Sequence, residues 1–395
     1  MLNFPQVFGS LLVLASTASL AAHLFARGKA AMLETAGFFL VTLIGLALVL
    51  SGKKRTKTQA GSANPVTVHD LLNGYRSTVL LYLAAKLGVA DLLADGPRSS
   101  SELAGLLRAH EPYLHRVLRG LVALDACTES PEGLFELTGV GRSLRTGKPD
   151  SLCAFAILCG EEFMSAWLGL AHSVMSGETA FDHVFGMSQW EHRKQHFDLN
   201  HNFNEWLTSM TNRVAMDLLA VYDFSSHHII IDVGGGHGAL ITAILNAYPA
   251  AAGILFDQAH VISGALPLIE AEGVGSRCRI VGGSFFDGIP GGIDACILKS
   301  VIHDWDDERS LVILKNCRKA LNENGKLLLI ERILPDRVEH DPQVILIDLH
   351  MLALTGGRER TEREFRILCE AAGFTIGRII PTQSGYRIIE GLVAR

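Results

Sequence analysis

The chain has 395 residues, enough for two or three compact domains, because a single domain usually runs to about 100–200 residues. Its formal net charge of −6 excludes the strongly basic balance that draws a whole chain to the phosphate backbone of nucleic acids. Its seven cysteines are scattered and never spaced C-x-x-C, which excludes a disulfide framework or a common zinc motif and indicates reduced thiols in a cytosolic working domain.

The first 52 residues are predicted to anchor the protein to a membrane. Residues 7–26 and 35–52 carry no charged side chain, and a helix of roughly 17–25 apolar residues crosses a bilayer. We therefore expect two transmembrane helices, over 7–26 and 33–51, that form a hairpin. A single spanning helix and a hairpin lying on the membrane surface remain alternatives. A cleaved signal peptide is less favoured, because the first ten residues contain no Lys or Arg.

Basic residues indicate the orientation of this anchor. Four Lys and Arg residues lie between positions 53 and 57, and the next acidic residue is Asp70. Cations near membrane helices gather on the cytoplasmic side. We expect a membrane-bound protein whose remaining domains, including the catalytic domain, face the cytoplasm. Residues 53–65 are polar and rich in small side chains, which is typical of a flexible linker.

Residues 66–150 are predicted to form a small helical domain. Leucines recur at helical spacing, and Ser99 with Glu102 is typical of a capped helix start. Two β-prone pieces around residues 130–133 then suggest a hairpin, so that the order of elements matches a winged helix. Such a unit can bind DNA, but its third helix carries only Arg116 and Arg119 as cations. Dimerisation is the favoured role.

Residues 151–222 are predicted to form a helical bridge rich in aromatic residues and methionine. Single residues of this kind are most often part of a core. As a group next to a cofactor domain they can roof an apolar substrate pocket. The substrate-binding candidates are Trp167, Phe203 and Met210 from the bridge, together with Met351.

From residue 223 to 395, short apolar strands alternate with helical segments. This order predicts a mostly parallel sheet covered on both faces, a doubly wound Rossmann-like α/β domain. A strand at 229–233 runs directly into Gly234, Gly235 and Gly236, where a ligand can approach the main chain closely. The spacing fits neither a dinucleotide fingerprint nor a P-loop.

Asp257 ends the next predicted strand, where a carboxylate can accept hydrogen bonds from two ribose hydroxyls. A ribose without a pyrophosphate indicates S-adenosylmethionine. The alternative for Asp257 is an ordinary surface acid at the end of a strand.

His303 follows another predicted strand, at the edge where ligands bind in open α/β sheets. A neutral imidazole there can take a proton near neutral pH. Glu331 and Glu359 are candidates for orienting it. The run of acids after His303 also fits a metal site, but acids in the first turn of a helix are favoured by the helix dipole, so no metal is expected.

Four motifs carry a specific resemblance: DVGGGHG, LKSVIHDWDDE, ERILP and GGRERT. Together with the segments around them, they resemble the plant and bacterial small-molecule O-methyltransferases that include the caffeic acid and acetylserotonin enzymes. The resemblance covers roughly residues 66–395 and leaves the hydrophobic N-terminus outside. It implies a class I methyltransferase domain behind a dimerisation domain, and a metal-independent homodimer whose N-terminal unit reaches toward the pocket of the partner.

The resemblance also implies residue roles. His303 corresponds to the general base, and Glu331 and Glu359 to the residues that hold it. Cofactor-binding roles fall on the residues of the glycine turn, the ribose acid and the adenosine end: Gly234, Gly236, Asp257 and Lys299.

Two departures affect the adenine end of the cofactor site. Gln258 and Ala259 replace the usual Leu-Pro pair, and Ser284 replaces the usual Asp before Phe285. Ser284 and Phe285 are still the candidates for contacting adenine. The loss of a carboxylate removes one acceptor, so we expect weaker cofactor affinity with the catalytic residues unchanged.

The predicted reaction moves a methyl group from S-adenosylmethionine to a hydroxyl of a small, lipophilic or aromatic metabolite. One alternative is a winged-helix regulator that only binds a ligand or the cofactor. Another is a relative of these enzymes that performs C-methylation or cofactor-assisted hydroxylation.

Overall fold

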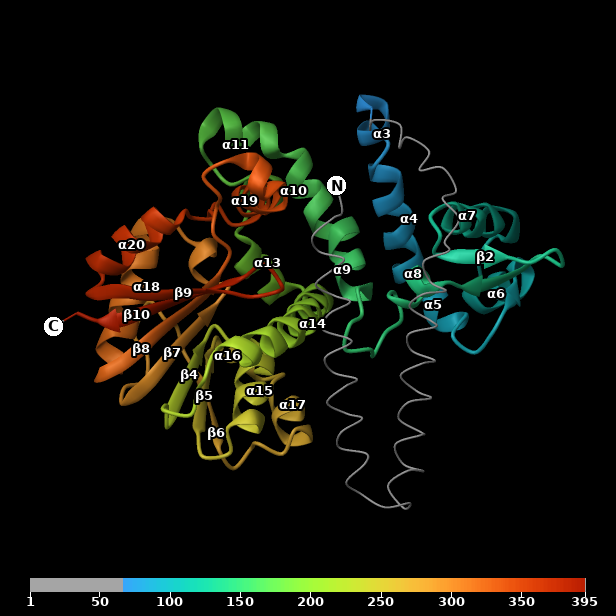
Figure 1. Ribbon diagram of the computed structural model, residues 1–395. Helices are drawn as coiled ribbons and strands as arrows, with labels where there is room; N and C mark the ends of the chain where they lie inside the picture. The colour runs from blue at the N-terminus through green and yellow to red at the C-terminus, as the bar shows by residue number, and fades with distance from the viewer. Residues whose placement is uncertain (1–66, 395) are drawn as a thin grey trace, which may run out of the picture. The chain divides into compact units, whose positions relative to one another are not determined.

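A computed structural model describes residues 67–394 (Figure 1). The predicted membrane hairpin and the linker up to residue 65 lie outside the described residues. From Leu72 onward the described chain forms one compact unit. Within it, the helical run Cys153–Ser176 is long and apolar enough, on composition alone, to cross a bilayer. Leu158, Phe163 and Ala166 of this run are buried in the protein core.

The N-terminal domain consists of short helices and a three-stranded antiparallel sheet of order β1-β3-β2. The predicted helix start is confirmed, because the Ser99 side chain accepts a hydrogen bond from the Glu102 backbone in a capping box. The predicted hairpin is present as β2 and β3, whereas β1 was not predicted. The winged-helix assignment stays a prediction. The elements are α3 (Val68–Leu72), α4 (Tyr75–Lys86), α5 (Val89–Leu92), β1 (Arg98–Ser99), α6 (Ser100–Leu107), α7 (Glu111–Ala123), β2 (Cys127–Glu129), β3 (Leu134–Leu137) and α8 (Gly139–Arg142).

A helical bridge follows and packs on both neighbours, since α9 contacts α4 of the N-terminal domain and α14 contacts α15 (Ala239–Ala247) of the C-terminal domain (Figure 1). Its aromatic residues divide into two groups: Phe163 and Phe181 are buried in a core of the bridge, while others face a cavity described below. The bridge contains α9 (Cys153–Leu158), the π-helix η2 (Cys159–Phe163), α10 (Met164–Leu168), α11 (Leu170–Ser176), α12 (Ala180–Phe185), α13 (Gln189–Gln195) and α14 (Phe197–Val221).

The C-terminal domain contains the predicted alternation of strands and helices, with seven strands in one sheet of order β6-β5-β4-β7-β8-β10-β9. The first five strands run parallel, and β10 is antiparallel to β8 and β9, so the sheet is mixed. The strands are β4 (Ile229–Val233), β5 (Ala252–Asp257), β6 (Cys278–Gly282), β7 (Ile293–Lys299), β8 (Leu321–Glu331), β9 (Phe374–Pro381) and β10 (Arg387–Val393).

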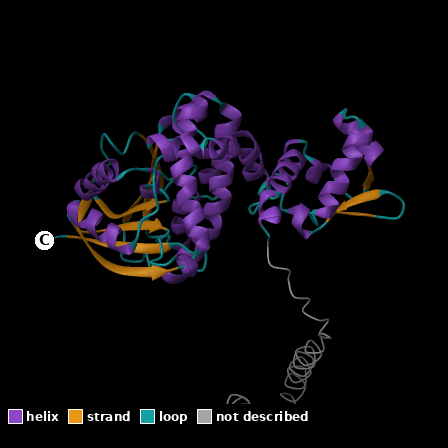
Figure 2. Ribbon diagram, turned by 90° about the horizontal axis from the view of Figure 1, so that it is seen from above, coloured by secondary structure: helices purple, strands orange, loops and turns teal. Residues whose placement is uncertain are grey.

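Helices cover both faces of this sheet (Figure 2). Each face has its own core, because the central strands are buried on both sides and carry apolar residues without alternation. The helices and turns are α15 (Ala239–Ala247), α16 (Ala259–Ile262), α17 (Leu266–Ala271), η3 (Ile302–Asp304), α18 (Asp307–Ala320), η4 (Val338–His340), α19 (Pro342–Leu354) and α20 (Glu362–Ala371).

The strand order reverses between β4 and β7. From β4 the chain proceeds outward through β5 and β6, and it then returns to β7 on the other side of β4. Open α/β sheets bind ligands in the crevice beyond the carboxyl ends of the strands at such a switch point. Gly234 follows β4 there, and Ser300 follows β7 with a φ of 54°, a left-handed conformation that is rare outside glycine.

Candidate active site

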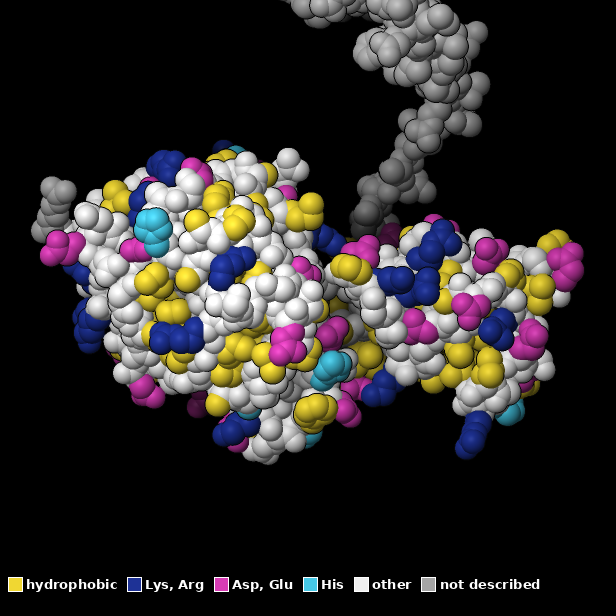
Figure 3. Space-filling model, turned by 90° about the horizontal axis from the view of Figure 1, so that it is seen from below, with side chains coloured by type: hydrophobic (Ala, Val, Ile, Leu, Met, Phe, Trp, Pro, Cys, Tyr) yellow, Lys and Arg dark blue, Asp and Glu magenta, His cyan; other side chains and the backbone are white. Residues whose placement is uncertain are grey.

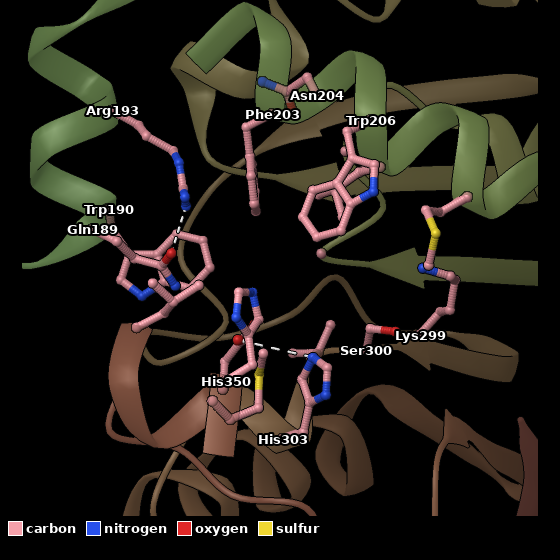
Figure 4. Close-up of a pocket in the computed structure, with 18 of the residues that line it drawn as sticks. Gln189, Trp190, Arg193, Phe203, Asn204, Trp206, Lys299, Ser300, His303 and His350 are labelled. Atoms are coloured by element: carbon pink, nitrogen blue, oxygen red, sulfur yellow. Dashed lines mark hydrogen bonds and ion pairs between the residues drawn. The ribbon is translucent and has the colours of Figure 1, made fainter. Parts of the chain in front are cut away.

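A cavity of ≈ 400 Å³ lies at this switch point, beyond the strand ends and against α13, α14 and α19 (Figure 4). Its walls are mostly apolar, with a few polar side chains, which is the usual character of a small-molecule site. The glycine turn and Asp257 line it, and so do His303 and Glu359. Residues predicted separately for the cofactor and for the chemistry therefore share one cavity.

His303 is held by Glu359. Its Nδ1 lies 2.9 Å from Glu359 Oε1, and the carboxylate accepts the proton that Nδ1 carries. Nε2 is then the nitrogen left to receive a proton. Burial alone would lower the pKa of His303, but the negative charges of Glu331, Glu359 and Asp304 outweigh it and hold that pKa well above its usual value.

Glu331 supports the histidine turn as well as the histidine ring. Its Oε1 accepts hydrogen bonds from the backbone N–H groups of Val301 and Ile302, at 3.0 and 2.8 Å. Its Oε2 lies 3.8 Å from His303 Nδ1, too far for a hydrogen bond. Burial raises the pKa of Glu331 to about 7. Glu331 thus fixes the turn that carries the histidine and adds a nearby charge, while Glu359 alone makes the direct bond.

The loop that carries Glu359 is packed tightly on the histidine turn. A Cβ at Gly357 would lie 2.1 Å from the His303 carbonyl oxygen, so only glycine allows this approach. Arg360, which is fully buried, donates to the carbonyls of Ile302 and Trp305 and to the Asp307 carboxylate. The backbone of the histidine turn is therefore bonded directly to the loop that positions its partner.

The glycine turn and Asp257 form the other end of the cavity. Asp257 Oδ2 accepts from the Gly236 backbone N–H at 2.8 Å, and Oδ1 accepts from the Gln258 N–H at 2.6 Å. Each oxygen keeps lone pairs for a ligand. A Cβ added at Gly236 would meet no protein atom within 4 Å, so the space beside this turn is open. An open backbone next to a diol acceptor fits the ribose end of S-adenosylmethionine.

Comparison with known proteins identifies the family. An O-methyltransferase domain matches residues 167–375, and an O-methyltransferase dimerisation domain matches residues 69–147. The chain belongs to the S-adenosylmethionine-dependent small-molecule O-methyltransferases. The phenazine O-methyltransferase PhzM of Lysobacter antibioticus is 45% identical over 321 residues, covering 81% of this chain and 94% of the relative. O-demethylpuromycin-O-methyltransferase of Streptomyces alboniger is 39% identical and covers 78% of this chain and 83% of the relative.

Solved structures agree with this identification. The crystal structure of LaPhzM is similar to this O-methyltransferase with a TM-score of 0.80 at 44% identity, covering 82% of this chain and 98% of the other. The neocarzinostatin-biosynthesis O-methyltransferase NcsB1 gives a TM-score of 0.72 at 29% identity over 83% and 99% of the two chains. That structure holds S-adenosylmethionine and 2-hydroxy-5-methyl naphthoic acid. The cofactor of the O-methyltransferase described here is S-adenosylmethionine.

The structure brings most of the predicted residues of this O-methyltransferase to the cavity. Five of the six cofactor candidates line it, as do all four predicted substrate-binding residues. Ser284 is the exception, because its Oγ accepts a hydrogen bond from the Phe286 backbone within its own turn. The lining candidates are Gly234, Gly236, Asp257, Phe285 and Lys299 for the cofactor, and Trp167, Phe203, Met210 and Met351 for the substrate.

Sequence analysis missed Asp232. This side chain is buried just below the glycine turn, and its Oδ2 has no hydrogen-bond partner among the described residues. Burial raises the pKa of Asp232 to about 7. An acid within an otherwise apolar strand is a signal that could have identified it, because an unpaired buried carboxylate is costly without a ligand.

Sequence analysis also missed the polar residues of the substrate wall, Gln189, Arg193 and His350. They come from α13 and α19, which are far apart in the sequence, and each stands alone among apolar or exposed neighbours. No motif or periodicity marks them. Only the packing of these helices over the cavity brings them together (Figure 4).

Proposed function

We propose that this O-methyltransferase methylates a hydroxyl group on a lipophilic, fused aromatic metabolite and that His303 is the general base. The proposal depends on how His303 is hydrogen-bonded. Glu359 accepts the hydrogen bond of His303 Nδ1 at 2.9 Å. The His303 side chain lines the cavity, and Nε2 is its remaining basic atom. When bound, S-adenosylmethionine supplies an electrophilic methyl group.

His303 Nε2 would take the proton of the substrate hydroxyl, and that oxygen would gain the methyl group as the S–CH3 bond breaks and S-adenosylhomocysteine leaves. The imidazolium that forms is stabilised by the carboxylate of Glu359 and by the nearby charge of Glu331. In the resting enzyme the same charges favour a protonated histidine.

Asp257, Gly234 and Gly236 are the residues we propose for the ribose and the adjoining chain of the cofactor. Phe285 and Lys299 line the same end of the cavity. Asp232, with its unpartnered oxygen beneath the glycine turn, is added to this set. These residues bind and orient the cofactor, and positioning of the reacting atoms supplies most of the rate acceleration.

The substrate class follows from the walls. Trp190 and Trp305 stack with ring centroids 6.1 Å apart, and Phe203 and Trp206 pack edge to face at 5.7 Å. Flat aromatic walls favour a flat aromatic ligand. By their names, relatives act on phenazines and on 2,7-dihydroxy-5-methyl-1-naphthoate, and we extend this fused aromatic class to the enzyme described here.

Replacing His303 tests the base assignment. With S-adenosylmethionine and a panel of hydroxylated phenazines, naphthoquinones and naphthoates, we expect wild type to add one methyl group to at least one compound, as measured by mass spectrometry. His303→Ala should lower kcat by roughly 10²–10⁴-fold with little change in affinity for S-adenosylhomocysteine. His340→Ala, an exposed histidine in η4, is the control. A His303→Ala enzyme with near-normal turnover would contradict the assignment.

Two alternatives are tested in the same preparation. His303, Glu331 and Glu359 offer donor atoms within 4.8 Å of one another, a set that could hold a metal ion. We expect that the enzyme does not require a metal. If dialysis against EDTA abolished the activity and Mg²⁺ or Zn²⁺ restored it, this expectation would be wrong.

The second alternative is a DNA-binding regulator, whose affinity for DNA must weaken steeply as the salt concentration rises. On the face in Figure 3, Lys and Arg side chains are interspersed with Asp and Glu, so we expect no such binding.

We further propose that residues 1–52 attach the enzyme to a membrane as a helical hairpin, with a linker at 53–65 and the catalytic part facing the cytoplasm. The functional units would be 66–150 for dimerisation, 151–222 for the roof of the pocket and 223–395 for cofactor binding and catalysis. Membrane fractionation of the full chain beside a variant that lacks residues 1–65 tests the anchor. Recovery of both proteins in the soluble fraction would refute it.

A further inference from the structure

Three polar side chains of α13 and α19 interrupt the apolar substrate wall: Gln189 and Arg193 on α13 and His350 on α19 (Figure 4). Asn200 and Asn204 of α14 line the cavity as well and bond to each other. None of them belongs to the catalytic set around His303 or to the cofactor end. Polar groups in an apolar pocket fix the orientation of a ligand. What each of them can still offer to a ligand follows from its existing bonds.

His350 offers a hydrogen-bond donor to the cavity. The indole Nε1 of Trp167 lies 3.0 Å from His350 Nδ1, and because an indole N–H can only donate, Nδ1 is the acceptor. Burial and the positive charges of Arg193 and His303 lower the pKa of His350 to about 4, so the ring is neutral and its proton sits on Nε2. Within residues 67–394, no hydrogen bond to this Nε2 is formed.

The ring of His350 is also held in place. Phe163 contacts it edge to face, with ring centroids 4.8 Å apart. Together with the bond from Trp167, this contact fixes the direction of the Nε2–H group. A fixed donor recognises an acceptor with less loss of side-chain entropy than a mobile one.

Arg193 offers no free charge. It is 2% exposed, and its Nη2 donates to Glu162 at 2.9 Å while Nη1 donates to Gln189 at 2.6 Å. Glu162 is completely buried, so the ion pair is closed inside the protein. The guanidinium lies 3.7 Å from the centre of the Phe203 ring. Arg193 therefore holds Phe203 as a flat wall, and its charge is already matched before any substrate binds.

From this arrangement we propose that the substrate is a fused-ring phenol with an uncharged hydrogen-bond acceptor, a carbonyl oxygen or a ring nitrogen, that accepts the Nε2–H of His350. This inference rests on the proposed function, because it assumes that the hydroxyl faces His303. The Nε2–H of His350 is a neutral donor, which suits a neutral acceptor. On the helices α13 and α19, the cation that lines the cavity is Arg193, and Glu162 already matches its charge, while Lys299 and Arg332 stand at the carboxyl ends of β7 and β8.

A matched pair of probes tests the proposal: a hydroxyphenazine, and the hydroxyanthracene with its hydroxyl at the same ring position. The two have the same shape and differ in the ring nitrogens. We expect wild type to prefer the phenazine by about 10-fold or more in kcat/KM. The hydroxyanthracene cannot accept the hydrogen bond from His350, and losing one hydrogen bond of about 1.4 kcal/mol corresponds to that factor. The difference should lie in KM, because the acceptor does not take part in the reaction.

His350→Phe should bring the kcat/KM ratio of the two probes close to one, and His350→Gln, whose amide N–H can reach the position of Nε2, should restore part of it. A thermal melt of each variant reports folding. An unchanged ratio in His350→Phe would overturn the proposal. So would a wild type that prefers a carboxylated phenol and loses that preference in Arg193→Leu.

The same data separate this inference from the proposed function. If wild type methylates neither probe and binds neither in the presence of S-adenosylhomocysteine, the fused aromatic substrate class is wrong and the inference falls with it. If wild type methylates both probes equally and His303→Ala abolishes both reactions, the proposed function stands and only the role of His350 is wrong.

Discussion

Gly236→Ala should weaken cofactor binding far more than it destabilises the fold. Gly236 has a φ of 59°, and a Cβ there would meet no protein atom within 4 Å. Gly177, at the end of α11, has the same two properties with a φ of 78°, but it does not line the cavity. The two positions are a matched pair: an alanine is strained at both, and only at Gly236 does its methyl group enter the space that we assign to the cofactor.

The magnitudes follow from that geometry. An alanine in the left-handed region costs about 1–2 kcal/mol, so both variants should lose this much free energy of unfolding. At Gly236 the added methyl group also overlaps the cofactor, and forcing such an overlap costs about 1–3 kcal/mol, which is roughly a 5- to 150-fold increase in Kd. The Gly177→Ala variant should bind S-adenosylhomocysteine with the affinity of the wild type.

Calorimetric titration with S-adenosylhomocysteine, alongside thermal melts with and without it, measures both effects. Wild type and Gly177→Ala should show the same ligand-induced rise in Tm, and Gly236→Ala a smaller one. The reasoning is refuted if Gly236→Ala binds within two-fold of wild type. It is also refuted if Gly177→Ala loses affinity to the same extent, since backbone strain alone would then explain the loss.

Three further changes probe the charges around the cavity. In wild type, kcat/KM should rise with pH through a pKa above 6.5, because His303, as the proposed base, must be deprotonated to act. Glu359→Gln removes a charge that favours the imidazolium, so initial rates should show the rise moved to lower pH with a lower plateau. Glu162→Gln leaves the buried Arg193 unpaired and should cost about 3–5 kcal/mol in a urea melt, against about 0.5 kcal/mol or less for Glu191→Gln, whose side chain is 46% exposed. Activity should survive EDTA dialysis unchanged.

The sequence predicted the parts of the site that lie in continuous motifs. His303 and Glu359 each stand in a run of residues whose backbone conformation is fixed locally: a strand end followed by a turn, and a loop that needs Gly357 in order to pack against that turn. The seven strands were equally predictable, because the central ones are buried on both faces and carry unbroken apolar runs.

Local bonds to the backbone could not be predicted from the sequence. Ser284 stays a predicted cofactor contact, but its hydroxyl also bonds to the N–H of Phe286, a local bond that serine forms readily in turns. Glu331 pairs with the histidine ring at 3.8 Å, and it also binds two backbone N–H groups of the histidine turn, which was not predicted. Spacing in the sequence cannot distinguish such outcomes.

The proposed base and the residues proposed to contact the substrate lie in different layers of this fold. His303 and Glu359 lie on loops at the carboxyl ends of sheet strands, where the buried Arg360 joins the two loops through the carbonyls of Ile302 and Trp305. The helices α13 and α19, which lie outside the sheet, carry Gln189, Arg193 and His350. A substitution of a cavity-facing side chain on those helices can therefore change which ring system fits the cavity while the bond from Asp348 on α19 to the Glu359 backbone is kept. This separation predicts that exchanging His350 alters the choice of substrate before it alters the chemistry.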